Sequence, residues 1–354
     1  MFIHARSGCL LLAAFLCCGA VSAQQNTPPA QAPPAQTGNR TSYLDVVVTP
    51  KSVPPVALQQ QDFTLMDDKT PRTITSFRAV SGREAPIEVI VVIDAVNTAF
   101  RNVGFERGQL DSFLHAEGGH LAYPVGLAVF TDDGIKVLGD FSSDGNALSA
   151  LLDGENTGLR SIGRASGFYG ASERLQLSLQ AMDRLLTSLA PRPGRKIVLW
   201  LSPGWPLLSG PHVDLDAKQR QQIFGDIVKF STELLQARVT LYSVNPLGAG
   251  ESLLTASYYK DFLKGVSKPN QVSVGNLALQ VLAVQSGGLA FNSNNDVAST
   301  LRQCIDEAAP YYEITFDQPG AEKSDEYHPL EIKLDKPGLT ARTRQAYYAQ
   351  PLPH

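Results

Sequence analysis

Two kinds of hydrophobic pattern divide this chain. In its middle, apolar residues form short, nearly continuous runs at 87–93, 125–130, 196–201 and 239–244. Such runs are typical of strands that are buried on both faces of a parallel sheet covered by helices. Near both ends of the chain, apolar and polar residues alternate instead. That alternation predicts strands with one face in a core and the other face in water.

Segments with helical periodicity lie between the buried runs. The longest covers 171–190 and places six apolar side chains on one face: Leu175, Leu179, Met182, Leu185, Leu186 and Leu189. Further helices are expected at 104–117, 216–237, 274–285 and from the Asp296 cap to 309. Regular alternation of strands and helices predicts an α/β domain with a doubly wound, mostly parallel sheet.

The alternating segments at the two ends predict two small groups of β-strands. They lie at 44–48, 62–66 and 73–77 before the α/β segment, and at 311–316, 328–334 and 339–344 after it. Neither group contains enough strands to form a stable core alone. We therefore expect the two groups to pair into one small all-β sandwich. Because chain ends often lie close together, the α/β domain can be inserted into such a sandwich without steric conflict.

The first residues have the pattern of a secretory signal peptide. Arg6 supplies the positive charge, 9–18 is the apolar segment, and Val21-Ser22-Ala23 offers small residues for cleavage before Gln24. The apolar segment is shorter than the roughly 20 residues that span a bilayer, although an uncleaved anchor is the alternative interpretation. The following segment, 24–41, is rich in Pro, Gln and Ala, which predicts a disordered linker.

The expected organisation has five parts: a signal peptide at 1–23, the linker at 24–41, sandwich strands at 42–80, the α/β domain at 86–309, and further sandwich strands at 310–350. The protein would be exported to the periplasm, the outer envelope or the medium, with no transmembrane segment after signal cleavage. Only Cys304 would remain in the mature chain, so no disulfide within the chain could support the fold. The net charge of -4 does not favour nucleic acid or anionic lipid as a partner.

The candidate chemistry lies where the first buried strand ends, at Ile93-Asp94-Ala95-Val96-Asn97-Thr98. In open doubly wound sheets, ligands bind at the carboxyl ends of the strands. An Asp at this position either caps the following turn or holds a cation, and the sequence leaves both interpretations open. The chain has no zincin motif, no nucleophile elbow and no phosphate-binding loop, which favours a binding protein over an enzyme.

Four segments together resemble a known family. They are Asp62-Phe63-Thr64-Leu65-Met66-Asp67-Asp68, the 93–98 segment, Leu201-Ser202-Pro203-Gly204-Trp205, and Arg342-Thr343-Arg344-Gln345-Ala346-Tyr347-Tyr348. Their order and spacing are similar to the von Willebrand factor A domain and, more narrowly, to the secreted "VWFA-related" proteins of acidobacteria. The resemblance covers nearly all of the mature chain. It implies an A-type α/β domain that binds a protein partner.

The family's metal-ion-dependent adhesion site uses Asp-x-Ser-x-Ser in a first loop, a Thr in a second and an Asp in a third. Its cation, Mg²⁺, prefers octahedral oxygen ligands. The resemblance assigns the first Asp to Asp94 and the last hydroxyl to Thr98. Ser172 could replace the second-loop Thr, with Ser166 as the alternative, and Ser202 stands at the third-loop Asp.

Two departures from the family's pattern make this expected site degenerate. Val96 stands where a Ser is expected, and Ser202 supplies a hydroxyl where a carboxylate is expected. Mg²⁺ is the cofactor that the resemblance implies. The alternative is that Asp94, Thr98 and Ser202 satisfy backbone groups at the edge of the sheet and bind no metal.

Two functions follow from these observations. The first is an exported, non-enzymatic adhesion module that recognises an extracytoplasmic protein through the loops after residues 93, 201 and 244. Asn97 and Trp205 would then lie on the binding face. Trp205 is either an exposed aromatic anchor there or is buried under a neighbouring loop. The alternative is a metal-independent scaffold or assembly factor of the cell envelope that uses the β-sandwich as its contact surface.

Overall fold

The computed structural model describes residues 40–51, 57–81, 85–155, 168–206, 214–247, 257–292 and 296–351. The expected signal peptide, the linker up to residue 39 and the candidate ligand Ser166 lie outside the described residues.

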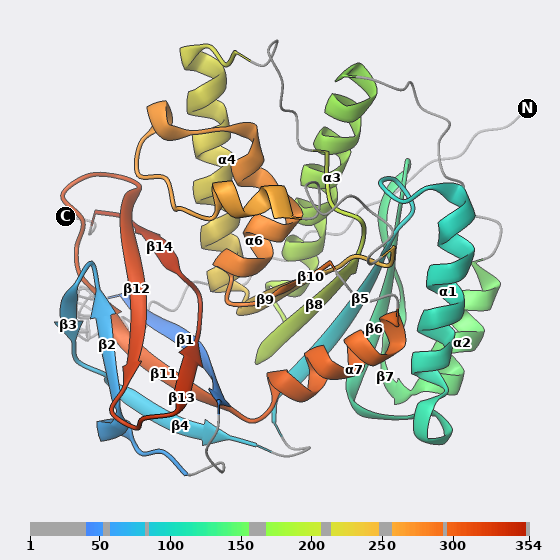
Figure 1. Ribbon diagram of the computed structural model, residues 1–354, viewed down its shortest axis with the longest axis horizontal. Coiled ribbons are helices and arrows are strands. Elements are labelled where there is room, and N and C mark those ends of the chain that lie inside the picture. Colours follow the sequence, from blue (N-terminus) through green and yellow to red (C-terminus); the bar gives the residue numbers. More distant parts are fainter. Residues whose placement is uncertain are drawn as a thin grey trace, which may run out of the picture. The chain divides into compact units, whose positions relative to one another are not determined.

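A six-stranded sheet forms the centre of the α/β domain (Figure 1). Its strand order is β10-β9-β8-β5-β6-β7. All neighbouring strands are parallel except β6 and β7, which are antiparallel at one edge. The strands are β5 (Ile87–Asp94), β6 (His120–Thr131), β7 (Gly134–Asp144), β8 (Arg195–Leu201), β9 (Val239–Val244) and β10 (Ala290–Phe291).

Helices cover both faces of this sheet. One face packs against α1 (Phe100–Leu114), α2 (Gly145–Gly154) and α7 (Val297–Ala308). The other packs against α3 (Phe168–Leu189), α4 (Ala217–Gln236) and α6 (Leu279–Gln285). In β5, successive side chains alternate between the two cores, and every residue except Glu88 is buried. The predicted doubly wound fold, which is von Willebrand factor A-like, is therefore confirmed.

The order of the strands creates a switch point beside β5. The chain builds β6 and β7 on one side of β5 and then returns to place β8 on the other side. At such a reversal the loops that leave two neighbouring strands diverge, which opens a crevice at their carboxyl ends. Asp94 is the last residue of β5 and therefore lies at this point.

The terminal segments form two four-stranded antiparallel sheets, β13-β1-β11-β4 and β14-β12-β2-β3. Strands from the two ends of the chain pair directly, as Leu44 does with Ile314 and Leu65 with Ile332. The sheets share a core that includes Leu44, Leu65, Ile314 and Phe316, so the expected sandwich is confirmed. Its strands are β1 (Arg40–Pro50), β2 (Phe63–Asp67), β3 (Thr70–Arg72), β4 (Ser76–Val80), β11 (Tyr311–Gln318), β12 (Glu326–Leu334), β13 (Leu339–Arg342) and β14 (Ala346–Ala349).

Several expected elements differ from the structure. The strand predicted at 73–77 begins later, as β4 at Ser76, because residues 73–75 are irregular and join β3 to β4. Helix α2 was not predicted, and α3 begins at Phe168, before the expected start at 171. The helix predicted at 274–285 is divided into a 3-10 turn (Val274–Leu277) and α6. Other 3-10 turns lie at Gln60–Asp62, Ala116–Gly119, Tyr258–Phe262 and Pro269–Gln271.

The sandwich contacts the α/β domain at the amino-terminal end of the sheet. Arg238, in the turn between α4 and β9, donates hydrogen bonds to Asp45 on β1 and Glu313 on β11, both at 2.6 Å. The backbone N–H of Gln345, between β13 and β14, donates to the Gln285 carbonyl at the end of α6 at 3.0 Å. These contacts lie at the amino-terminal end of β9. The loop that follows β9 begins at the other end of the strand.

Candidate functional site

Asp94 is the centre of the candidate site, and its carboxylate is fully buried. Oδ1 accepts hydrogen bonds from the backbone N–H groups of Val96 at 3.1 Å and Asn97 at 2.9 Å. Oδ2 accepts from Asn97 Nδ2 at 2.8 Å and from Trp200 Nε1, on the neighbouring strand β8, at 3.1 Å. Four N–H donors of the protein therefore surround the two carboxylate oxygens.

Burial and hydrogen bonding act in opposite directions on this carboxyl group. Burial raises the pKa of Asp94, because removing a carboxylate from water disfavours its charged form. Hydrogen bonds from Asn97, Trp200 and Ser202 each lower the pKa, because they stabilise that charge. These hydrogen-bond donors thus stabilise the charge of Asp94, as water would stabilise the charge of an exposed carboxylate.

The arrangement around Asp94 does not fit an octahedral Mg²⁺ site. A cation bound to Oδ2 would have to displace the indole N–H of Trp200 or the side-chain amide of Asn97. Trp200 is fully buried, so its displaced N–H would lack an acceptor, whereas Asn97 Nδ2 would keep Ser178 Oγ. Val96 offers no side-chain oxygen, and its isopropyl group packs into the core beneath α3 and α4. Mg²⁺ requires oxygen ligands, whereas the groups around the Asp94 carboxylate are N–H donors and the Ser202 hydroxyl.

Thr98 lies beside a second buried carboxyl group, Glu106 on α1, and the sequence analysis did not identify Glu106. Both residues are buried, with Glu106 at 0% exposure. Burial raises the pKa of Glu106 to about 9; the Thr98 hydroxyl lowers it, and the charge of Asp94 raises it further. Glu106 is therefore a neutral carboxylic acid near pH 7, which is a poor ligand for a cation.

The remaining expected ligands are distributed differently from the prediction. Ser202 is buried at the end of β8, and its hydroxyl lowers the pKa of Asp94 through a hydrogen bond. Its Oγ also accepts a hydrogen bond from the Gly204 N–H at 3.1 Å. Ser172 does not precede α3 as expected but lies within its second turn, because the helix begins at Phe168. In the described part of the chain no hydrogen bond joins Ser172 to the group around Asp94. Ser178, about 9 Å further along α3, accepts from Asn97 Nδ2 at 2.9 Å instead.

Trp205 is not the exposed aromatic anchor that the sequence suggested. It is only 3% exposed and packs edge-on against Trp200, with ring centroids 5.4 Å apart. Trp200 is itself held by Asp94, so Trp205 covers the buried centre and does not reach solvent. Among the described residues, an exposed aromatic side chain near this edge is Tyr169, in the first turn of α3, with 86% exposure.

The two residues that the sequence analysis missed left a detectable signal. Glu106 lies between Val103 and Leu110 on the face of α1 that packs into the core. Ser178 lies between Leu175 and Met182 on the buried face of α3. A polar residue on the apolar face of an amphipathic helix is uncommon, because it must find a partner in the core.

Among the described residues, neither Cys304 nor His328 lies at the edge of the sheet that carries Asp94. Cys304 is buried on α7, and burial raises the pKa of its thiol well above the usual range, so the reactive thiolate is disfavoured. His328 lies in the sandwich, where its Nδ1 is 2.7 Å from Asp67 Oδ1.

None of the helices that the structure describes combines the length and the apolar character needed to cross a bilayer.

Comparisons with known proteins add the following findings. No protein-family model matches the chain, and no curated protein matches it. Among solved structures, it is similar to BatB from Bacteroides thetaiotaomicron, with 11% identity over 63% of this chain and 98% of that one, and a TM-score of 0.35. It is similar to manganese-loaded Plasmodium vivax TRAP, with 10% identity over 78% and 98% of the two chains and a TM-score of 0.36.

A third similar structure is the human COPII-coat protein Sec24c, with 10% identity, 78% of this chain covered and a TM-score of 0.34. The chain spans 44% of the length of that protein. At such identities and TM-scores these matches carry no conclusion about function. The strand order and the two helical layers define the protein as an α/β chain with a von Willebrand factor A-like fold inserted in a β-sandwich.

Proposed function

We propose that this chain is an exported, non-enzymatic binding module that recognises a protein partner through the loops at the carboxyl end of its central sheet, without a metal ion. The single observation that carries the proposal is the hydrogen-bonded centre at Asp94. Through Trp200 and Asn97 it joins the loop after β5 to strand β8 and, by way of Ser178, to helix α3.

This connection supports a binding role because it fixes the elements from which the loops depart. A surface that is ordered before the partner arrives loses less conformational entropy on association. Asn97 is partly exposed above the buried centre, and Tyr169 projects from the start of α3. A Tyr side chain offers a large contact area with few rotatable bonds, which suits an interface anchor.

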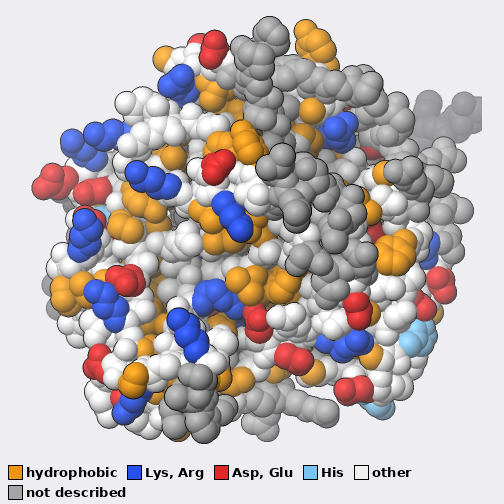
Figure 2. Space-filling model, in the orientation of Figure 1, with side chains coloured by type: hydrophobic (Ala, Val, Ile, Leu, Met, Phe, Trp, Pro, Cys, Tyr) orange, Lys and Arg blue, Asp and Glu red, His pale blue; other side chains and the backbone are white. Residues whose placement is uncertain are grey.

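The charge distribution supports a protein partner over a nucleic acid. The net charge is -4, and on the face shown in Figure 2 acidic and basic side chains are interspersed. A nucleic-acid site would require a concentrated basic surface. The signal-like first segment supports export, so the partner is expected outside the cytoplasm.

The test compares two exposed tyrosines in separate parts of the molecule. A partner is captured from envelope extracts with the wild type, purified, and its dissociation constant is measured with each variant. Tyr169→Ala is expected to weaken binding by at least tenfold, about 1.4 kcal/mol, because it removes the anchor at the carboxyl edge. Tyr43→Ala, which changes a 46% exposed side chain on β1, is expected to bind like the wild type.

The opposite result would contradict the proposal. If Tyr43→Ala loses the partner and Tyr169→Ala keeps it, the sandwich is the contact surface, as the scaffold hypothesis requires. Equal binding by both variants would exclude the edge around α3 as the anchor. Each variant must retain the wild-type melting temperature, because Tyr43 also lies under the Arg238 guanidinium at 5.0 Å.

A further inference from the structure

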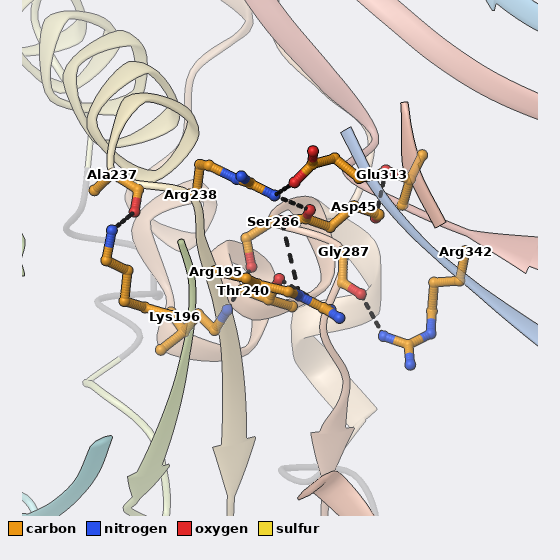
Figure 3. Close-up of polar contacts among 12 residues, drawn as sticks. Asp45, Arg195, Lys196, Ala237, Arg238, Thr240, Ser286, Gly287, Glu313 and Arg342 are labelled. Atoms are coloured by element: carbon orange, nitrogen blue, oxygen red, sulfur yellow. Dashed lines mark hydrogen bonds and ion pairs between the residues drawn. The ribbon is translucent and has the colours of Figure 1, made fainter. Parts of the chain in front are cut away.

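The junction between the sandwich and the α/β domain contains more basic than acidic side chains (Figure 3). The basic side chains Arg195, Lys196 and Arg344 are 1%, 2% and 7% exposed. Arg238 lies among them with its side chain 17% exposed. The acidic residues that pair with Arg238 are Asp45 and Glu313.

The two acidic residues are already paired. Arg238 Nη2 lies 2.6 Å from both Asp45 Oδ1 and Glu313 Oε2. Arg195 Nε lies 3.8 Å from Asp45 Oδ2, and Arg78 Nη2 lies 3.1 Å from Glu313 Oε1. The two negative charges are therefore offset by three arginines before the remaining basic groups are considered.

In the part of the chain that the structure describes, neither Arg344 nor Lys196 forms a direct ion pair, and the nearest carboxylates, Asp45 for Arg344 and Glu88 for Lys196, act on them only at longer range. Arg344 Nη1 donates to the Ser231 carbonyl at 3.2 Å, and Lys196 Nζ donates to the carbonyls of Ala237, at 3.0 Å, and Arg192. Burial lowers the pKa of Arg344 to about 10 and lowers that of Lys196 as well. Burying a charge without a counter-charge is costly, because carbonyl dipoles replace hydration only in part.

A small cavity lies beside these groups, between the two domains. Its volume is about 20 Å³, and its lining includes Arg238, Arg344, Thr240 and Ser286. Space for one water-sized sphere needs roughly 10–15 Å³, so the cavity admits a single small occupant. Asp45 also lines the cavity, but Arg238 and Arg195 offset its charge.

We propose that this cavity binds one small monovalent anion of chloride size, held by the guanidinium groups of Arg238 and Arg344. The anion supplies a direct counter-charge for Arg344, whose printed hydrogen bond goes to the Ser231 carbonyl. Because its ligands come from the turn before β9 and from the segment between β13 and β14, it also strengthens the contact between the two domains.

The test is a chloride titration in which the melting temperature is measured at each chloride concentration. Sodium chloride replaces sodium gluconate at constant ionic strength, since gluconate is too large for the cavity. The wild type is expected to gain stability with the logarithm of the chloride concentration once that concentration exceeds the dissociation constant, as mass action requires for one site that exists only in the folded state. Arg344→Met is expected to lose the chloride dependence. Arg302→Met, which changes an exposed arginine on α7, is expected to keep it.

Two results would overturn the proposal. A melting temperature that is independent of chloride would show that the cavity binds no chloride. A chloride dependence that Arg344→Met retains in full would place the anion elsewhere. If Arg344→Met does not fold, crystals of the wild type grown in sodium bromide decide the question, because bromide in the cavity gives an anomalous signal and water gives none.

Discussion

Replacing Asp94 with alanine is expected to lower the free energy of unfolding by about 3–5 kcal/mol, which is among the largest effects of a single substitution. The variant leaves the indole N–H of Trp200 without its acceptor in a fully buried place. It also removes the acceptor of the Asn97 side-chain amide and of the backbone N–H groups of Val96 and Asn97. Urea denaturation measures the change. A loss below about 1 kcal/mol would mean that Asp94 does not hold these elements together.

Two further variants separate the hydrogen-bonded centre from a general effect of removing an aspartate. Asp153→Ala removes a carboxylate whose side chain is 74% exposed, and its effect is expected to stay within about 0.5 kcal/mol. Asp94→Asn keeps the size and one oxygen, but its amide N–H groups face those of Trp200 or Asn97. It is therefore expected to remain clearly destabilised.

The second large effect concerns Glu106 and depends on pH. Its pKa is about 9 in the folded protein against the ordinary value of 4.5, so between these pH values folding is accompanied by uptake of a proton. The stability that this group contributes is fully present below pH 4.5 and is lost as the pH rises toward 9. At pH 7 the loss is about 3 kcal/mol, at roughly 1.4 kcal/mol for each pH unit above the unfolded value.

Glu106→Gln is expected to remove most of this pH dependence, because the amide stays neutral throughout. Relative to wild type, the variant should gain stability steadily between about pH 5 and pH 9. Glu322→Gln, at an exposed position, should follow the wild-type curve. The measurement is the free energy of unfolding in urea at each pH. Parallel curves for the wild type and Glu106→Gln would show that Glu106 titrates normally.

The sequence predicted the fold well because the two hydrophobic patterns differ in kind. The continuous run 87–93 could only be a strand buried on both faces, and the alternating ends had to find partners to form a core. Local detail was less predictable. Thr73, Ile74 and Thr75 have the composition of a strand but connect β3 to β4, since strand preference depends on the neighbouring strand.

The candidate site was predicted in position but not in contacts. The position of Asp94 could be predicted from its own strand. Its hydrogen bond from Trp200 could not, because that contact depends on the register in which β5 pairs with β8. The sequence left open whether Trp205 is exposed to a partner or buried under a neighbouring loop. Its burial follows from the fixed orientation of Trp200, against which it packs.

Isothermal titration of the wild type with Mg²⁺ and Mn²⁺ tests most directly whether Asp94 is held by the protein's own donors instead of by a cation. We expect no saturable heat at millimolar concentrations of either metal, and no change in melting temperature. Stoichiometric binding that Asp94→Asn abolishes would contradict the proposal, because it would require the cation to displace Trp200 or Asn97 from the carboxylate.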